Sequence, residues 1–378
     1  GDRSADRTWH ANASNECKAC HNAESRFVLG FVSNQLNRDV PTAAGKVNQL
    51  SLLATQGVLD EPVKVAADDP SKLAAIHDQQ ATLESRARSY LHVNCSMCHQ
   101  PGGNAIVSFF LRRDMPFEQL NTNKGTGIGT FGIQNAKIIA PGDPYRSILV
   151  YRMSKLGYAR MPYIGSRVVD PAGISIVTQW IESLPREQQA NAAPPSPPLA
   201  SDSPAATSLK LLTSNPASAR DQRQAAIRDL LQSTESSLAL ISRMHRGEMQ
   251  AEDRKFASVQ GSSATRGDIR GLFETFVPES QRRATLGDRI EPRTILDRQG
   301  DVQRGKLIFF SDAGRCRACH EADDRTKSLG PTLREINKKY PKIEEMLEHV
   351  LEPSKKIDES FAAFSITDRK STRLNSSH

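Results

Sequence analysis

Apolar residues recur at helical spacing in several stretches of the chain. In the middle of the chain, two such groups follow each other and are separated by Ser233. Their members are Ile227, Leu230, Leu231, Leu238, Ile241 and Met244. Residues three or four positions apart share one face of an α-helix, although the second group matches one face more loosely. The pattern predicts two short amphipathic helices joined near Ser233 as a helical hairpin.

Three further helices are predicted in the same way, and no stretch shows the strong alternation of a β-strand. One passes through Ala87, Tyr90 and Leu91, and one stops near Pro278 after Ile269, Leu272, Phe273 and Phe276. The third carries Ile174, Val177, Trp180, Ile181 and Leu184, and stops at Pro185. The stretch 258–266 is of low complexity. No run of 18 apolar residues exists, so no transmembrane helix is predicted.

All six cysteines fall in pairs, each followed by a histidine. The three motifs are Cys17-Lys-Ala-Cys20-His21, Cys95-Ser-Met-Cys98-His99 and Cys316-Arg-Ala-Cys319-His320. This spacing is that of c-type haem attachment. The two thiols bond the vinyl groups on one porphyrin edge, and the histidine that follows reaches the iron. A zinc site needs two such pairs together, and a redox pair needs no histidine, so haem is favoured.

The motifs and the composition predict a mainly α fold of tandem cytochrome c-like domains with a helical insert. A Pro- and Ser-rich stretch without an apolar period separates the second domain from the insert and predicts an extended linker. The predicted segments are a first haem domain at 1–84, a second at 85–186, the linker at 187–205, the insert at 206–297, a third haem domain at 298–367 and a tail at 368–378.

The second iron has a candidate for its other axial ligand in Met161, which precedes a proline in a late loop followed by a helix. Met115 and Met153 are the alternatives, with packing roles as the simpler interpretation. A thioether ligand gives a comparatively high reduction potential. For the first iron, His77, His10 and His92 are candidates, and an open iron or a ligand from outside the chain is the other possibility.

The third motif is preceded by a predicted helix that carries Gly305 and Phe309. We expect the glycine to allow a close helix crossing and the phenylalanine to pack on the porphyrin. After His320 the remaining methionine is Met346, inside the helical run 343–351 rather than in a late loop. We therefore expect the ligand of this iron to lie in a C-terminal region that the chain lacks.

Charge adds little to the functional picture. The chain has 378 residues and a net charge of +7. Residues 368–378 resemble a translated sequencing adapter and contribute three basic and one acidic residue, so residues 1–367 carry +5. Such a charge is typical of an ordinary solvated surface, and no nucleic-acid partner is predicted. Residue 1 is glycine, so we expect a missing N-terminal region that includes a signal peptide.

Two resemblances extend these predictions. Residues 1–185 resemble a dihaem cytochrome family associated with PQQ-dependent sugar dehydrogenases, and residues 269–367 resemble the planctomycete/verrucomicrobial type of haem-binding domain. The first rests on the two haem motifs and the segments 27–30, 35–38, 48–50, 87–91, 94–102, 141–144 and 160–162. The second rests on 272–274, 282–283, 305–309, Gly330-Pro331 and 352–357. His92 departs from the first family, where an acidic residue is expected.

The resemblance implies electron transfer through three haem c groups outside the cytoplasm, in the periplasm or another exported location. It implies an electron-donor dehydrogenase, either separate or fused upstream, and a respiratory acceptor. No catalytic residue is predicted, and whether the chain is itself an enzyme stays open. The alternatives are a dihaem peroxidase-like enzyme that uses the first haem as an open site, and a haem-based sensor.

Overall fold

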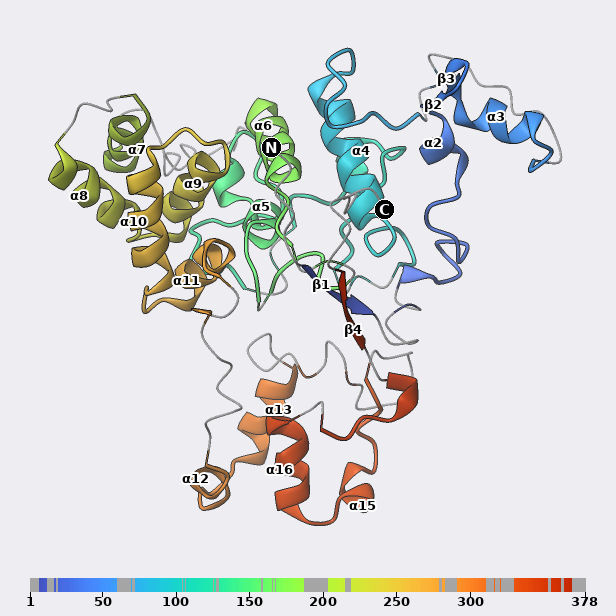
Figure 1. Cartoon of the computed structure of the whole chain (residues 1–378). Helices are drawn as coiled ribbons and strands as arrows, with labels where there is room; N and C mark the ends of the chain where they lie inside the picture. Colours follow the sequence, from blue (N-terminus) through green and yellow to red (C-terminus); the bar gives the residue numbers. More distant parts are fainter. Residues whose placement is uncertain are drawn as a thin grey trace.

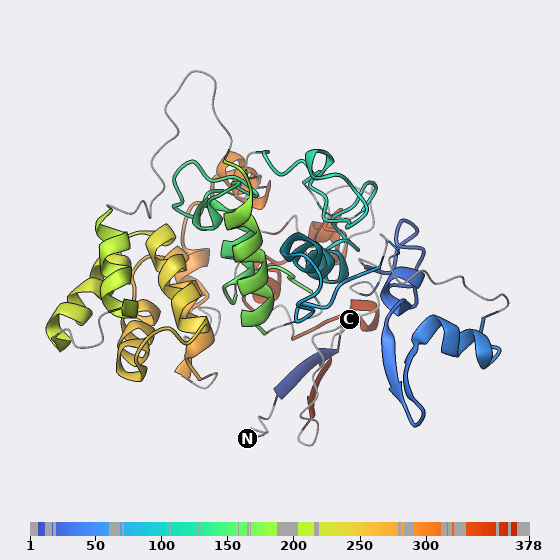
Figure 2. The same cartoon turned by 90° about the horizontal axis from the view of Figure 1, so that it is seen from above.

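The computed structural model describes residues 7–11, 17, 20–59, 69, 72–103, 105, 107–124, 126, 129–157, 159–164, 166, 168–186, 203–214, 219–278, 281–282, 291–310, 316, 320, 330–352, 355–361 and 364–368. These residues are mainly α-helical, as predicted, and their strands form two sheets of two strands each. The helical insert lies on one side of a central helical region, and the elements that follow the first motif lie on the other (Figures 1 and 2). The third motif region forms a separate group of helices, as Figure 1 shows.

The region after the first motif is built from short elements, α2 (Ser33–Leu36), β2 (Asp39–Thr42), β3 (Gly45–Asn48) and α3 (Gln49–Thr55). Strands β2 and β3 form an antiparallel hairpin. Asn48 ends this hairpin and also caps α3, because its side chain accepts hydrogen bonds from the backbone N–H groups of Leu50 and Ser51. Strands of four residues are too short to produce a clear alternating pattern in the sequence.

The central region contains the two helices that flank the second motif, α4 (Leu83–Cys95) and α6 (Pro171–Ser183). Both were predicted. Between them lie η1 (Phe117–Gln119), η2 (Pro144–Arg146) and α5 (Ile148–Met153). Helix α4 packs against α6 at Gly173. A Cβ atom on this glycine would lie 2.0 Å from Cζ of Tyr90, so the close approach requires the absence of a side chain.

The insert contains α7 (Pro204–Ser214), α8 (Arg220–Leu230), α9 (Thr234–His245), α10 (Ala251–Ser262) and α11 (Gly267–Phe273), with α11 continued by η3 (Glu274–Phe276). The predicted hairpin is confirmed, and Ser233 is the N-cap of α9. The helix predicted to stop near Pro278 is also confirmed. Helix α10 extends into the low-complexity stretch, where Gly261 leaves space for the ring of Phe273.

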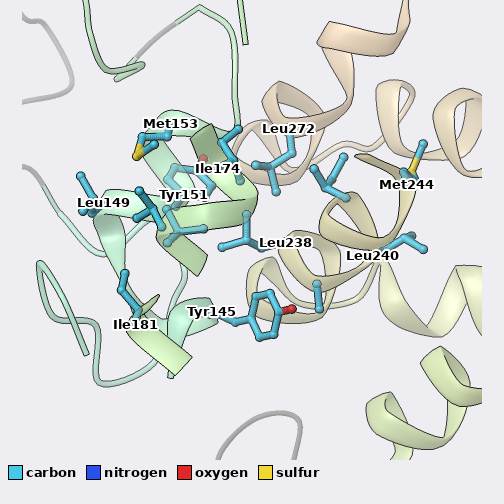
Figure 3. Close-up of a cluster of buried hydrophobic side chains, with 14 of the residues drawn as sticks. Tyr145, Leu149, Tyr151, Met153, Ile174, Ile181, Leu238, Leu240, Met244 and Leu272 are labelled. Carbon is cyan, nitrogen blue, oxygen red and sulfur yellow. The ribbon is translucent and has the colours of Figure 1, made fainter. Parts of the chain in front are cut away.

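The insert and the central region share one hydrophobic core. Figure 3 shows side chains of α9 and α11 gathered beside those of α5 and α6. Leu238 of α9 and Leu272 of α11 are buried in the same cluster as Tyr151 and Ile174. Polar contacts border this core: the buried carboxylate of Glu235 accepts a hydrogen bond from the backbone N–H of Gln134 at 2.7 Å. The two predicted segments therefore pack as one body.

The third motif region contains α12 (Arg293–Leu296), α13 (Val302–Phe310), α15 (Ile336–Lys339), α16 (Ile343–Leu351) and η6 (Glu359–Phe361). Helix α13 carries Gly305 and Phe309, as predicted. However, no described atom lies within 4 Å of a Cβ placed on Gly305, so the described residues show no close helix crossing there. From 291 to 361, none of the residues whose side-chain exposure the structure describes is buried.

The two ends of the described chain meet in a second small sheet. Strand β1 (Arg7–Ala11) pairs antiparallel with β4 (Phe364–Asp368), in a register that places Arg7 opposite Asp368. Figure 1 shows this ribbon between the central helices and the third motif region. Asp368 is the first residue of the stretch that resembles an adapter. The ribbon joins the segment that precedes the first motif to the segment that follows the third.

Candidate functional site

In each of the three motifs, the histidine makes an α-helical hydrogen bond to the first cysteine. The backbone N–H of the histidine donates to the carbonyl of the first cysteine, at 2.8 Å from His21 to Cys17, 2.9 Å from His99 to Cys95 and 2.8 Å from His320 to Cys316. Such an i→i+4 bond places positions i, i+3 and i+4 on one side of the turn. In the first two motifs, both thiols and the imidazole therefore start from the same face; Cys319 of the third motif lies outside the described residues.

Each histidine is also held through the same ring nitrogen. Nδ1 lies at hydrogen-bond distance from a backbone carbonyl further along the chain: Phe27 for His21 at 2.6 Å, Phe109 for His99 at 3.2 Å, and Pro331 for His320 at 2.9 Å. An imidazole that donates from Nδ1 to a carbonyl keeps the lone pair of Nε2 for a metal. The three sites therefore share the hydrogen-bond arrangement of metal-binding histidines.

The loop at the first motif reaches this arrangement through unusual backbone angles. Arg26 has a φ of 54° and Phe27 a φ of 62°, both in the left-handed region that non-glycine residues rarely adopt. The turn directs the carbonyl of Phe27 at His21. Ser25 supports the same loop, because its hydroxyl donates to the carbonyl of Cys20 at 2.6 Å. The strained residues thus serve to orient the imidazole.

The second site is the most enclosed. His99 follows the C-terminus of α4 and packs edge-on against the ring of Phe109, with ring centroids 5.2 Å apart. Burial lowers the pKa of His99, and the charge of Arg152 lowers it further. The imidazole is therefore held in its neutral form, which is the form that binds a metal.

Met161 lies in the loop between α5 and α6, as predicted, and this loop is fixed by Arg152. The backbone N–H of Met161 donates to the carbonyl of Arg152 at 3.0 Å, and the Arg152 guanidinium donates to the carbonyl of Ala159 at 2.8 Å. The charge of the same arginine acts on His99. Arg152 is thus linked both to the loop of Met161 and, through its charge, to His99. Met153 is buried in the hydrophobic core and Met115 is half-buried.

The candidates for the first iron differ in their surroundings. Both ring nitrogens of His92 face hydrogen-bonding groups: the backbone N–H of Arg113 donates to Nδ1 at 3.1 Å, and the side-chain amide of Asn34 lies 3.3 Å from Nε2. His92 therefore connects α4 to α2 rather than presenting a lone pair. His77 is exposed. The side chain of His10 lies outside the described residues.

The first two motifs lie against each other. Sγ of Cys20 is 3.9 Å from Sγ of Cys98. The hydrogen bond between these sulfurs lowers the pKa of Cys20 to about 7 and raises the pKa of Cys98. Cys95, at the end of α4, packs against the core, and its burial raises its pKa to about 12. Cys17 is exposed, and Cys316 is half-buried.

Several large apolar side chains are exposed beside the first motif and in the third motif region. Beside His21, Phe27 is 61% exposed and Phe31 is 54% exposed. In the third region, α16 has apolar residues at helical spacing, yet Ile343 is 64% exposed and Val350 72% exposed. An apolar group of the size of a porphyrin would cover such surfaces, since exposed apolar patches commonly mark binding sites. The residues beside His21 therefore fit a haem at the first motif.

Sequence reasoning did not identify the carbonyl partners of the histidines. Phe27 and Pro331 belong to segments that carry the family resemblances, but the sequence does not indicate that their carbonyls face the histidines. Phe109 belongs to no motif recognised in the sequence. A signal was available in Gly330-Pro331, because this dipeptide fixes the backbone direction of a loop close after His320.

Within the described part of the chain, no group of three or more His, Cys, Asp or Glu residues is arranged to hold a metal ion. None of the described helices has the length and hydropathy needed to cross a membrane. No family model matches the chain, and neither a curated protein nor a solved structure matches it.

Proposed function

We propose that the chain is an electron-transfer protein that binds three haem c groups covalently, one at each motif. The observation that carries the proposal is the common geometry of the three histidines: each closes a helical turn on its first cysteine and is held through Nδ1 by a backbone carbonyl. One such arrangement has many explanations, but the same arrangement at every motif favours a shared ligand.

In this proposal, Cys17 and Cys20, Cys95 and Cys98, and Cys316 and Cys319 form the thioether bonds. His21, His99 and His320 would hold the three irons through Nε2, and Met161 would be the further protein ligand of the iron held by His99. The bound group supplies an iron that changes between its ferric and ferrous states. The protein supplies a fixed imidazole orientation, a neutral His99 and a core that excludes water beside the second site.

We further propose that the protein works in the periplasm or another exported location, because covalent haem attachment occurs there. The donor would be a dehydrogenase, with a PQQ-dependent sugar dehydrogenase suggested by the resemblance, and the acceptor a component of a respiratory chain. The proposal of tandem cytochrome c-like domains is supported by the helix α4 that leads into the second motif and by its packing on α6.

Haem content tests the proposal directly. The chain is exported with a signal peptide in a bacterium that attaches haem, and covalent haem is counted by mass and by the spectrum of the pyridine complex. We expect three haems per chain, and two when both cysteines of any one motif are replaced by serine. His77→Ala is the control and keeps three. A chain that contains zinc or no covalent haem would contradict the proposal.

The alternative of a dihaem peroxidase-like enzyme is favoured by one observation, the engagement of both His92 ring nitrogens. This engagement removes one candidate ligand from the first iron. An enzyme of this kind would show a high-spin first haem and turnover of hydrogen peroxide. An electron carrier would show low-spin haems and no turnover, so spectroscopy and a peroxide assay on the same sample separate the two.

A further inference from the structure

The contact between the first two motifs extends beyond one pair of sulfurs. Cys20 and Cys98 are 3.9 Å apart at Sγ, although 78 positions separate them in the chain. Next to them, a Cβ on Gly102 would lie 2.8 Å from Cγ of Glu24, so the segments that follow the two motifs are also in close contact. The loops of the first and second motifs therefore pack against each other.

One further hydrogen bond joins the segment before α4 to that helix: the backbone N–H of Ala74 donates to the hydroxyl of Ser89 at 3.0 Å. The neighbouring residue Leu73 is tied to α2, because its backbone N–H donates to the carbonyl of Asn34 at 3.3 Å. Asn34 in turn contacts His92. Ser89 and His92 both belong to the helix that ends at Cys95, so the chain that follows the first motif is joined to α4 at two places.

We propose that in the haem-free chain Cys20 and Cys98 form a disulfide bond, and that this bond closes the first two haem attachment sites together. A disulfide has an S–S distance of about 2.05 Å, so rotation of the two side chains must bring the sulfurs closer by roughly 2 Å. The second part of the inference rests on the proposed function, because it assumes that the motifs attach haem. The first part does not.

The chemistry is thiol–disulfide exchange with a disulfide-bearing oxidant. The thiolate of one cysteine attacks a sulfur of the oxidant and expels the first thiolate, which gives a mixed disulfide. The other cysteine of the pair then attacks the sulfur bonded to the chain and expels the second thiolate. Two thiols of the chain lose two electrons and two protons, and one disulfide of the oxidant becomes two thiols.

The closure would affect both sites, because each motif needs two free thiols for its two thioether bonds. A Cys20–Cys98 bond leaves one thiol in each motif, at Cys17 and Cys95. The third motif keeps both of its thiols. Reduction of a single bond would therefore release the first and second sites at the same time, which couples their loading.

The test is disulfide mapping of the full-length haem-free chain. The chain is reduced, equilibrated with oxidised and reduced glutathione, alkylated, digested and analysed by mass spectrometry. Because the fold holds the two sulfurs together, we expect the Cys20–Cys98 link to be about tenfold more abundant than a link within either motif. In guanidinium chloride the preference should be lost, and links within motifs should dominate because their loops are shorter.

Two variants sharpen the result. Cys98→Ser should abolish the link, whereas Cys316→Ser, which also removes one of the six thiols, should leave its abundance unchanged. Dominance of links within motifs under native conditions would overturn the disulfide, and the same holds if native and denatured chains give equal patterns. Haem loading is then measured separately: the linked chain should accept haem at the third motif only. Loading at all three motifs would overturn the closure, whereas loading at none would count against the proposed function.

Discussion

The shared core predicts that a mutation in the insert destabilises the second motif region. Leu238 of α9 is 1% exposed and lies in the same cluster as the side chains of α5 and α6 (Figure 3). Leu238→Ala removes buried apolar volume and leaves a cavity, which costs about 2–5 kcal/mol at fully buried leucines. With a urea dependence of about 2–3 kcal/mol per M, the unfolding midpoint should fall by about 1–2 M.

The assay reads the two regions separately. Trp180 lies in α6, is 1% exposed and belongs to the second motif region. In a Trp9→Phe background it is the remaining tryptophan of the chain, and its fluorescence reports the unfolding of that region. We expect the fluorescence midpoint of Leu238→Ala to fall together with the midpoint of helix content measured by circular dichroism.

A matched control is Val259→Ala in α10. This residue belongs to the same insert but is 54% exposed, so the change should shift the midpoint by less than about 0.3 M. The reasoning would be refuted if Leu238→Ala lowered the helix signal at lower urea while the Trp180 transition stayed in place. That result would mean that the insert and the second motif region unfold independently.

Three further predictions concern single residues. Met161→Ala should abolish the sulfur-to-iron absorption band in the far red and lower one midpoint potential, and an unchanged band would assign the ligand to another methionine. Asp253→Asn should cost about 3–5 kcal/mol in urea unfolding, because it removes the negative charge that lies 3.1 Å from the buried Arg223 guanidinium; Glu335→Gln, in an exposed ion pair, should cost less than about 0.5 kcal/mol. Burial lowers the pKa of His245 to about 4. The unfolded chain binds this proton from about pH 6.5 downwards, so stability should fall by up to about 3 kcal/mol between pH 6.5 and 4, and His245→Phe should flatten that slope.

Helix positions followed from the sequence where one face of the helix meets the core. The hairpin at Ser233 and the helix α6 were predicted because their apolar residues recur at helical spacing, which is the pattern of a helix with one buried face. Helix α10 was not predicted, because its C-terminal part is rich in serine and contains Gly261. The absence of a side chain at Gly261 makes room for the ring of Phe273, which belongs to another helix. A contact with another helix cannot be recognised from the local sequence pattern.

The candidate sites also combine features that local spacing predicts with features that only the packing of distant segments determines. The cysteines and histidines of the candidate sites follow from spacing alone, because one helical turn determines their relative positions. The carbonyl at Phe27 depends instead on two left-handed residues that no local propensity favours. The contact between Cys20 and Cys98 depends on how the first motif region packs on α4. Packing between distant segments was not accessible from the sequence.

The β1–β4 ribbon has a consequence for the order of folding. Arg7 pairs with Asp368, so strand β1 can pair only after strand β4 has been synthesised. During synthesis from the N-terminus, the first motif emerges long before the residues that complete the ribbon. Closing a loop of this length also carries a high entropic cost, so the ribbon forms after the local helices and the shared core. Strand β1 is therefore among the last described elements to reach its final structure.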